Sequence, residues 1–282
     1  MRTLRTIDEM RSALEAPRRR GAMVGLVPTM GAFHDGHLSL MRLARRDCEV
    51  VVVSLFVNPT QFNEPQDLVS YPRDETRDAV LAEGVGVDLL FAPAQEEIYP
   101  AGFATTVSVS GITRDFEGDA RGRTHFDGVA TVVSKLLNIV MPDVAYFGEK
   151  DAQQVQVIRR LVEDLNMPVR IQAGATVREP DGLAMSSRNA HLSPEERRRA
   201  AAIPRALSQA QEMVGAGQQD ARVIEQAVRA ELESSATQVD YVRIVEPERL
   251  APIRTIAGPA RMLVAARFGN TRLIDNQLLR SE

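Results

Sequence analysis

The apolar run from Val50 to Val57 is the feature that most constrains the fold of this 282-residue chain. Only Ser54 interrupts the run, which is typical of a parallel strand buried on both faces of a sheet. Shorter apolar runs alternate with helical patterns between Met23 and Ala173. This alternation predicts an α/β fold with a Rossmann-like parallel sheet that has helices on both faces.

The pattern changes in the last third of the chain. Ser193 to Glu196 form a capping box with Pro at the first helical position, in a helix that we expect to kink near Pro204, and Asp220 caps a second helix. Alternating apolar residues then predict half-exposed strands, with a turn at Gly269-Asn270. We therefore expect two domains, residues 1–175 and a smaller α+β domain at 176–282, with a hinge near Thr176.

The segment from Val27 to His37 joins an expected strand to an expected helix that begins at Leu38. Gly31 and Gly36 permit tight turns, and unpaired backbone N–H groups at a helix start attract anions. His34 and His37, three residues apart, can donate to oxygens where charge develops during a reaction. A satisfied surface pair and a pair of metal ligands are the alternatives, but no nearby Cys or third His completes a usual ligand set.

Polar side chains also follow two other expected strands. Asn58 and Gln61 lie in the loop after Val57, where ligands bind in open α/β sheets, although turn formation explains both residues equally well. Gly148 to Asp151 follow the expected strand Val144–Phe147. There Lys150, one of only two lysines among 34 basic residues, can neutralise phosphate, and Asp151 can accept from ribose hydroxyls. Gln154 can face the same cleft. The alternative for this segment is a capped helix start.

The segment Leu183–Asn189 combines the hydroxyls of Ser186 and Ser187 with the guanidinium of Arg188. These groups can grip the outer phosphates of a nucleotide, and a Ser-rich linker is the alternative.

Charge and composition exclude several classes of protein. A net charge of -4 gives no electrostatic reason to expect nucleic acid or an anionic membrane as partner. No apolar stretch is long enough to cross a bilayer and no signal peptide is evident, so we expect a cytoplasmic protein. The single cysteine, Cys48, can form no internal disulfide. These patterns assign no role to Lys135 or His125.

Taken together, five motifs resemble the pantothenate synthetase family, the pantoate–β-alanine ligases of the adenylate-forming nucleotidyltransferase superfamily with its His-x-Gly-His motif. The motifs are Pro28-Thr-Met-Gly-Ala-Phe-His-Asp-Gly-His37, Phe56-Val-Asn-Pro-Thr-Gln-Phe62, Phe147-Gly-Glu-Lys-Asp151, Asp181-Gly-Leu-Ala-Met-Ser-Ser-Arg-Asn189 and Leu273-Ile-Asp-Asn276. They extend over essentially the whole chain. Met185 to Arg188 depart from the Lys-Met-Ser-Lys-Ser form of the wider superfamily but match these synthetases, and Phe33 stands where Leu is expected.

The resemblance implies an ATP-dependent ligation in two steps. Pantoate attacks the α-phosphorus of ATP to give pantoyl adenylate and pyrophosphate, and the amine of β-alanine then displaces AMP to give pantothenate. The implied catalytic residues are His37, His34 and Lys150. The implied ATP-binding residues are Met30, Gly31, His34, Gly36, His37, Gly148, Glu149, Lys150, Asp151, Val177, Met185, Ser186, Ser187 and Arg188. Gln61, Gln154 and Asn58 are implied to bind pantoate or β-alanine.

The resemblance also has implications for domains and partners. It implies that residues 1–175 bind nucleotide and pantoate and that residues 176–282 form a lid. It further implies Mg²⁺ bound with ATP as co-substrate, no tightly bound organic cofactor, and a homodimer. It does not identify the metal ligands.

Two other functions remain compatible with the same residues. A nucleotidyltransferase whose product keeps the AMP group would release pyrophosphate but make no amide, whereas a nucleotide-binding sensor would turn over no ATP. A dehydrogenase is disfavoured, because no Gly-x-Gly-x-x-Gly follows the first strand.

Overall fold

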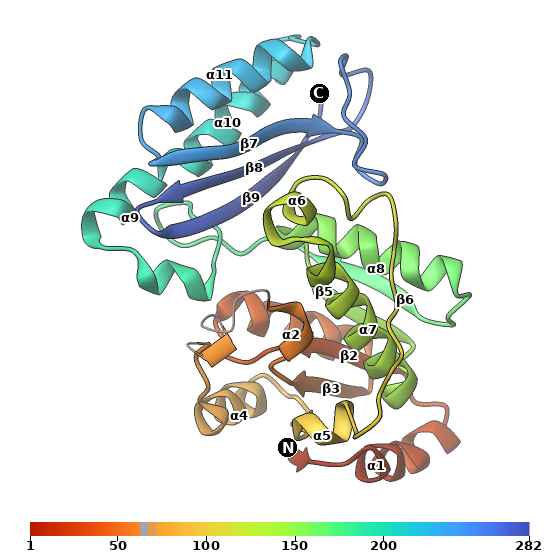
Figure 1. Cartoon of the computed structure of the whole chain (residues 1–282). Coiled ribbons are helices and arrows are strands. Elements are labelled where there is room, and N and C mark those ends of the chain that lie inside the picture. Colours follow the sequence, from red (N-terminus) through yellow and green to blue (C-terminus); the bar gives the residue numbers. More distant parts are fainter. Residues whose placement is uncertain (63–67, 70, 282) are drawn as a thin grey trace. The chain divides into compact units, whose positions relative to one another are not determined.

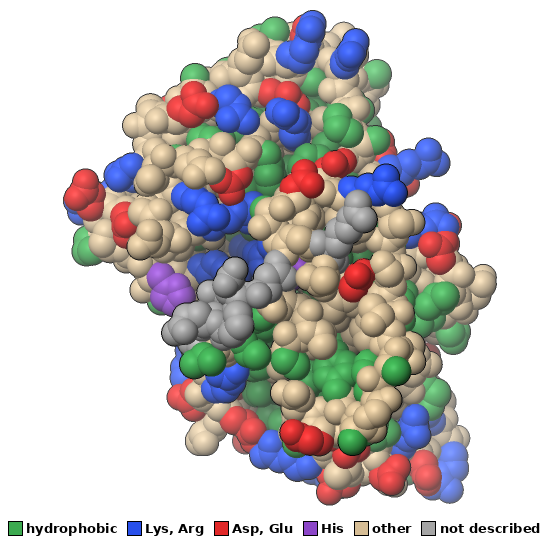
Figure 2. All heavy atoms as spheres, viewed as in Figure 1, with side chains coloured by type: hydrophobic (Ala, Val, Ile, Leu, Met, Phe, Trp, Pro, Cys, Tyr) green, Lys and Arg blue, Asp and Glu red, His purple; other side chains and the backbone are tan. Residues whose placement is uncertain are grey.

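The computed structural model describes residues 1–62, 68–69 and 71–281 (Figure 1). The chain divides into two compact units. The first contains Met1–Glu149 and Gln153–Ala175, and the second contains Lys150–Ala152 and Thr176–Glu282. No helix in the described ranges is long and apolar enough to span a membrane. Basic and acidic side chains are interspersed on the visible surface of both units (Figure 2).

A six-stranded, entirely parallel sheet organises the first unit, in the order β1-β4-β3-β2-β5-β6. Its strands are β1 Arg2–Leu4, β2 Val24–Thr29, β3 Val50–Leu55, β4 Leu89–Phe91, β5 Val144–Gly148 and β6 Arg170–Gly174. Its helices are α1 Ile7–Arg19, α2 Asp35–Asp47, α4 Glu75–Gly84, α5 Gln95–Ile98, α6 Glu117–Arg121, α7 Arg123–Val140 and α8 Ala152–Asp164, with the 3₁₀ turn η1 Pro59–Gln61. A further 3₁₀ turn, η2 Glu149–Asp151, joins β5 to α8, and its last two residues belong with Ala152 to the second unit. The expected parallel α/β sheet is confirmed.

Strand β3 shows why its apolar run is continuous. Val50 and Val52 pack in one hydrophobic core, with residues of α1, α7 and α8, whereas Val51 and Val53 pack in another, with residues of α2 and α4. Successive side chains of a strand point to opposite faces, so a sheet covered by helices on both sides requires apolar residues at every position.

The second unit is a three-stranded antiparallel sheet in the order β7-β8-β9, with helices α10 and α11 packed in the same core. Its elements are η3 Ser187–His191, α9 Pro194–Ala200, α10 Ala202–Gly215, α11 Ala221–Glu233, β7 Gln238–Val245, β8 Ala260–Phe268 and β9 Thr271–Leu279. The capping box at Ser193 and the cap at Asp220 both form.

Several local expectations need correction. Strand β8 was expected to be half-exposed, yet every residue except Arg267 is buried. One face of the strand, with Met262, Val264 and Phe268, packs in the core of this unit, and Arg261 on the other face bonds Asn276 of β9. The pattern from Thr6 to Ala16 predicts a helix that ends at Pro17, but α1 continues past this proline, which lies in its last turn. The expected kink at Pro204 is instead a break at Ala201, which leaves the proline near the start of α10, where it is tolerated.

Candidate active site

Three of the predicted polar segments follow neighbouring strands. Strand β2 pairs with β3 on one side and β5 on the other, so the order of strands along the chain reverses at β2. In open α/β sheets, ligands bind outside the carboxyl ends of the strands at such a reversal. The segments after β2, β3 and β5 contain His34, Gln61 and Glu149 respectively, and a 2.8 Å contact from Gln61 Nε2 to Met30 Sδ links the first two segments.

The two histidines cap their helix reciprocally. Helix α2 begins at Asp35 rather than at Leu38, and His34 is its N-cap residue. The N–H of Gly36 donates to His34 Nδ1 at 3.2 Å, and the N–H of His34 donates to His37 Nδ1 at 3.4 Å. Because each Nδ1 accepts, a neutral imidazole at either position carries its proton on Nε2. The ring centroids lie 4.2 Å apart, so both Nε2–H donors belong to one small region.

This capping corrects one expectation about the helix start. Unpaired backbone N–H groups were expected around the glycine turn and helix start, but those of Gly36 and His37 donate to the side chain and carbonyl of His34. An anion at this end of α2 would therefore meet the imidazole donors and the helix dipole. Within the described ranges, no group of three or more His, Cys, Asp or Glu side chains could hold a metal ion.

Asn58 is committed to contacts inside the protein. Its side chain is 1% exposed, and its amide donates to Gln61 Oε1 and to the Gly128 carbonyl, both at 3.1 Å. Its Oδ1 accepts from the hydroxyl of Tyr99 at 2.8 Å. Both donors of the amide are thus used, so the structure favours positioning of Gln61 over the expected direct contact with substrate.

Helix α7 holds the same loop from a second direction. A Cβ atom on Gly128 would lie 2.4 Å from the carbonyl oxygen of Thr60, so only glycine permits this approach of helix and loop. His125 Nδ1 donates to the Gln61 carbonyl at 2.7 Å. The sequence patterns did not predict a role for Gly128 or His125. An isolated glycine within a helical pattern is nevertheless a known signal of close backbone approach.

Lys150 lies in η2 directly after β5 and Glu149. Its side chain is only 17% exposed, and its Nζ lies 3.3 Å from Asp151 Oδ1. The Asn276 amide donates to the Lys150 carbonyl at 2.9 Å, a contact within the second unit. A Cβ on Gly148 would meet no atom within 4 Å, so the protein leaves open space there. Gln154 is half-buried in the first turn of α8.

The segment with Ser186 to Arg188 is a braced hairpin rather than a Ser-rich linker. Met185 N–H donates to the Val177 carbonyl at 2.9 Å, and the Ser186 hydroxyl accepts from the Arg188 N–H at 3.3 Å. Further side chains support the segment. Asn189 donates to Glu179 and to the Ala184 carbonyl, and Arg197 bonds Glu179 at 2.6 Å and Asp181 at 2.8 Å.

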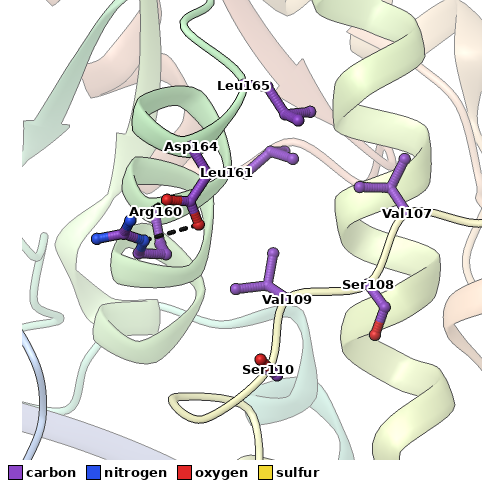
Figure 3. A pocket seen from close by; sticks show the side chains of 8 residues that line it. All are labelled: Val107, Ser108, Val109, Ser110, Arg160, Leu161, Asp164 and Leu165. Carbon is purple, nitrogen blue, oxygen red and sulfur yellow. Dashed lines mark hydrogen bonds and ion pairs between the residues drawn. The ribbon is translucent and has the colours of Figure 1, made fainter.

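A surface cavity of about 240 Å³ lies in the first unit (Figure 3). Its lining combines apolar side chains of the 107–110 segment and α8 with the ion pair Arg160–Asp164. None of the predicted site residues lines it.

The chain is similar to known proteins over nearly its whole length. The model of the family described as pantoate-beta-alanine ligase matches residues 2–278. A pantothenate synthetase of Moorella thermoacetica is 52% identical over 280 residues, which cover 99% of both chains. The crystal structure of pantothenate synthetase from Thermus thermophilus is 49% identical, with a TM-score of 0.93, and the match covers 98% of this chain and 99% of that one. A Francisella tularensis pantoate-beta-alanine ligase, solved in complex with beta-gamma ATP and beta-alanine, is 34% identical with a TM-score of 0.82 and coverage of 99% and 97%.

Proposed function

The chain belongs to the pantoate–β-alanine ligase family, and on that premise we propose that His34 and His37 stabilise adenylyl transfer from ATP to pantoate. The protein is an enzyme that condenses pantoate with β-alanine at the expense of ATP, to give pantothenate, AMP and pyrophosphate. The observation that carries the assignment of the histidines is their pair of bonds to Nδ1, which leaves the proton of each neutral imidazole on Nε2 as a donor.

Adenylyl transfer is the first step. The pantoate carboxylate attacks the α-phosphorus, and negative charge develops on the phosphoryl oxygens and on the departing pyrophosphate. Fixed donors aimed at such charge act more strongly than water, because they need no reorganisation during the reaction. His34 and His37 supply these donors, with His37 as the proton donor, and Lys150 neutralises phosphate charge.

Other residues of the proposed site bind and orient the substrates. Gln61 and Gln154 bind the hydroxyls and carboxylate of pantoate, and Asn58 positions Gln61. Neutral amides suit this task because they orient a carboxylate nucleophile without the full positive charge that would reduce its reactivity. Nucleotide contacts are assigned to Met30, Gly31, Gly36, Gly148, Glu149, Asp151 at the ribose, Val177, Met185, and to Ser186, Ser187 and Arg188 at the phosphates.

The second step forms the amide. The β-alanine amine attacks the acyl carbon of pantoyl adenylate, the bond from that carbon to the phosphate oxygen breaks, and AMP leaves. We assign to the second unit, residues 176–282 with a hinge near Thr176, the role of a lid that excludes water from the acyl adenylate. A lid variant that still coupled every ATP consumed to amide formation would contradict this role.

Mg²⁺ belongs to the proposal as the ion that accompanies ATP. Enzymes usually bind Mg²⁺ through one or two carboxylates together with substrate phosphates. When bound, the ion would neutralise phosphate charge, and no residue of this chain is assigned to it. A homodimer in the cytoplasm completes the proposal.

Product analysis tests the function directly. ATP, Mg²⁺, D-pantoate and β-alanine are supplied together, and each is then omitted in turn. Pantothenate and AMP in equal amounts, dependent on all three substrates, are expected. An AMP-containing product that persists in the presence of β-alanine would indicate a nucleotidyltransferase instead, and absence of turnover would indicate a sensor.

A further inference from the structure

The turn from Gly31 to Phe33 adopts a backbone conformation that needs external support. Gly31 has a φ of 91° and Ala32 a φ of 54°, so a non-glycine residue occupies the left-handed region. L-residues with a side chain rarely adopt this region, and they keep it only where the surrounding structure over-determines it. The turn directly precedes His34, the cap of α2.

Asp78 of α4 supplies that support. Its side chain is 1% exposed, and its two oxygens accept from the N–H of Ala32 at 2.7 Å and the N–H of Phe33 at 2.8 Å. The neighbouring Arg77 donates from Nη1 to the Phe33 carbonyl at 3.1 Å. The first turns of α4 thus hold both polar backbone groups of Phe33 with charged side chains, whose hydrogen bonds are stronger than neutral ones.

Phe33 links the supported turn to the imidazole rings of His34 and His37. It is 1% exposed, and its ring centroid lies 5.6 Å from that of His37. The peptide after Phe33 leads directly into the reciprocal caps of His34 and His37. A shift of the turn would therefore move both rings together.

We propose that Asp78 is a positioning residue for adenylyl transfer, which holds the Gly31–Phe33 turn so that His34 and His37 present their Nε2–H groups to the reacting phosphate. The proposal rests on the function proposed for the two histidines. Asp78 itself contacts no reacting atom in this role. Its effect is exerted through the backbone of Ala32 and Phe33.

The test compares Asp78→Asn with the wild type in the first turnover of pyrophosphate release from ATP and pantoate, without β-alanine. The amide oxygen of Asn can accept from one of the two N–H groups, while its NH₂ group faces the other. Displacement of a catalytic group by about 1 Å can reduce a rate about 10²-fold, so we expect a loss of that order with KM values changed less than about threefold.

Asp88→Asn is the matched control. Asp88 also accepts from a backbone N–H, that of Val51, and pairs with Arg45, but at the opposite end of β3. Its first-turnover rate should equal that of the wild type. Arg77→Ala is a second test variant, because the Arg77 side chain is 56% exposed; its Nη1 also lies 3.6 Å from Asp78 Oδ1, but Asp78 keeps its bonds to the N–H groups of Ala32 and Phe33. Arg77→Ala should reduce the first-turnover rate several-fold. If Asp78→Asn does not fold, a wild-type rate for Arg77→Ala would overturn the proposal.

Nitrogen NMR of the histidines gives a readout that stability alone would not change. The wild type should show unprotonated, hydrogen-bonded Nδ1 atoms at His34 and His37, and folded Asp78→Asn should lose this signature at one or both. A folded Asp78→Asn enzyme with the wild-type first-turnover rate would overturn the proposal. A lower rate that is explained entirely by a smaller folded fraction would overturn it as well. Failure of the wild type itself to form adenylate would refute the proposed function instead.

Discussion

The turn at Gly31–Phe33 and the hairpin at Val177–Arg188 are both held by carboxylates, but in different ways. Asp78 binds backbone N–H groups and is 1% exposed. Glu179 and Asp181 both bind the side chain of Arg197, Asp181 also accepts from the N–H of Leu183 at 3.2 Å, and the two carboxylate side chains are 21% and 32% exposed. A buried carboxylate bound to backbone fixes the chain itself, whereas partly exposed ion pairs depend on flexible side chains and are screened by solvent. The difference is consistent with the proposed roles, in which the turn positions the catalytic histidines and the hairpin binds the phosphates of ATP.

The largest effect should come from removing an imidazole. His37→Ala deletes the proposed proton donor and the acceptor for the His34 N–H. We expect the first-turnover rate of pyrophosphate release to fall about 10²- to 10³-fold. His191→Ala, at the end of the 3₁₀ turn Ser187–His191, is the control and should retain the wild-type rate. Equal first-turnover rates for His37→Ala and His191→Ala would contradict the catalytic role of His37, and the turn Gly31–Phe33 would then have no catalytic group to position.

The two lysines allow a matched pair of substitutions. Lys150→Met should reduce kcat/KM for ATP about 10- to 10²-fold, because it removes the charge that is proposed to neutralise phosphate. Lys135→Met removes a cation–π contact in which Nζ lies 4.6 Å from the centroid of Phe103. That variant should lose about 0.5–1 kcal/mol of stability in urea titrations and keep its kinetic constants. The reverse pattern would contradict the assignment of Lys150.

Gly128→Ala tests whether the loop Asn58–Gln61 is held as rigidly as the turn Gly31–Phe33. The added Cβ would lie 2.4 Å from the Thr60 carbonyl, so helix or loop must shift. We expect a loss of about 1–3 kcal/mol in stability and a higher KM for pantoate, through displacement of Gln61. Gly215→Ala is the control, since its Cβ would meet no atom within 4 Å. An unchanged KM for pantoate would argue against Gln61 as its ligand.

The smallest effect should be seen at the hairpin, and it should depend on pH. Burial opposes ionisation, but the Arg197 guanidinium lowers the pKa of Glu179 and of Asp181 below their ordinary values of 4.5 and 3.8. Each pair therefore stabilises the folded state above those values, and its contribution disappears as pH falls through the lowered pKa. Arg197→Gln should cost about 1–2 kcal/mol at pH 7 and progressively less below pH 4.5. The measurement is urea titration between pH 7 and pH values below 4.5. A loss of unfolding free energy that stayed constant over this range would show that ion pairing with Arg197 does not stabilise the hairpin.

Much of the architecture could be predicted from local patterns. The run Val50–Val57 predicted a strand buried on both faces, because only helices on both sides of a sheet make every position apolar. Caps at Ser193 and Asp220 were predicted for a similar reason, since capping depends on residues a few positions apart. The burial of β8 was not predicted, because it depends on the strands beside it.

The sequence alone therefore determined which residue types are present for chemistry: two histidines at the end of a strand, a rare lysine after another, and two serines before an arginine. Tertiary structure decided how these groups are held. Asp78 lies 46 residues from Ala32, Gly128 lies 70 from Asn58, and Asn276 lies 126 from Lys150. No local periodicity encodes such contacts, because they arise only when packing brings distant segments together. Geometry within a few residues can be read from a pattern, whereas the support that fixes it depends on the whole fold.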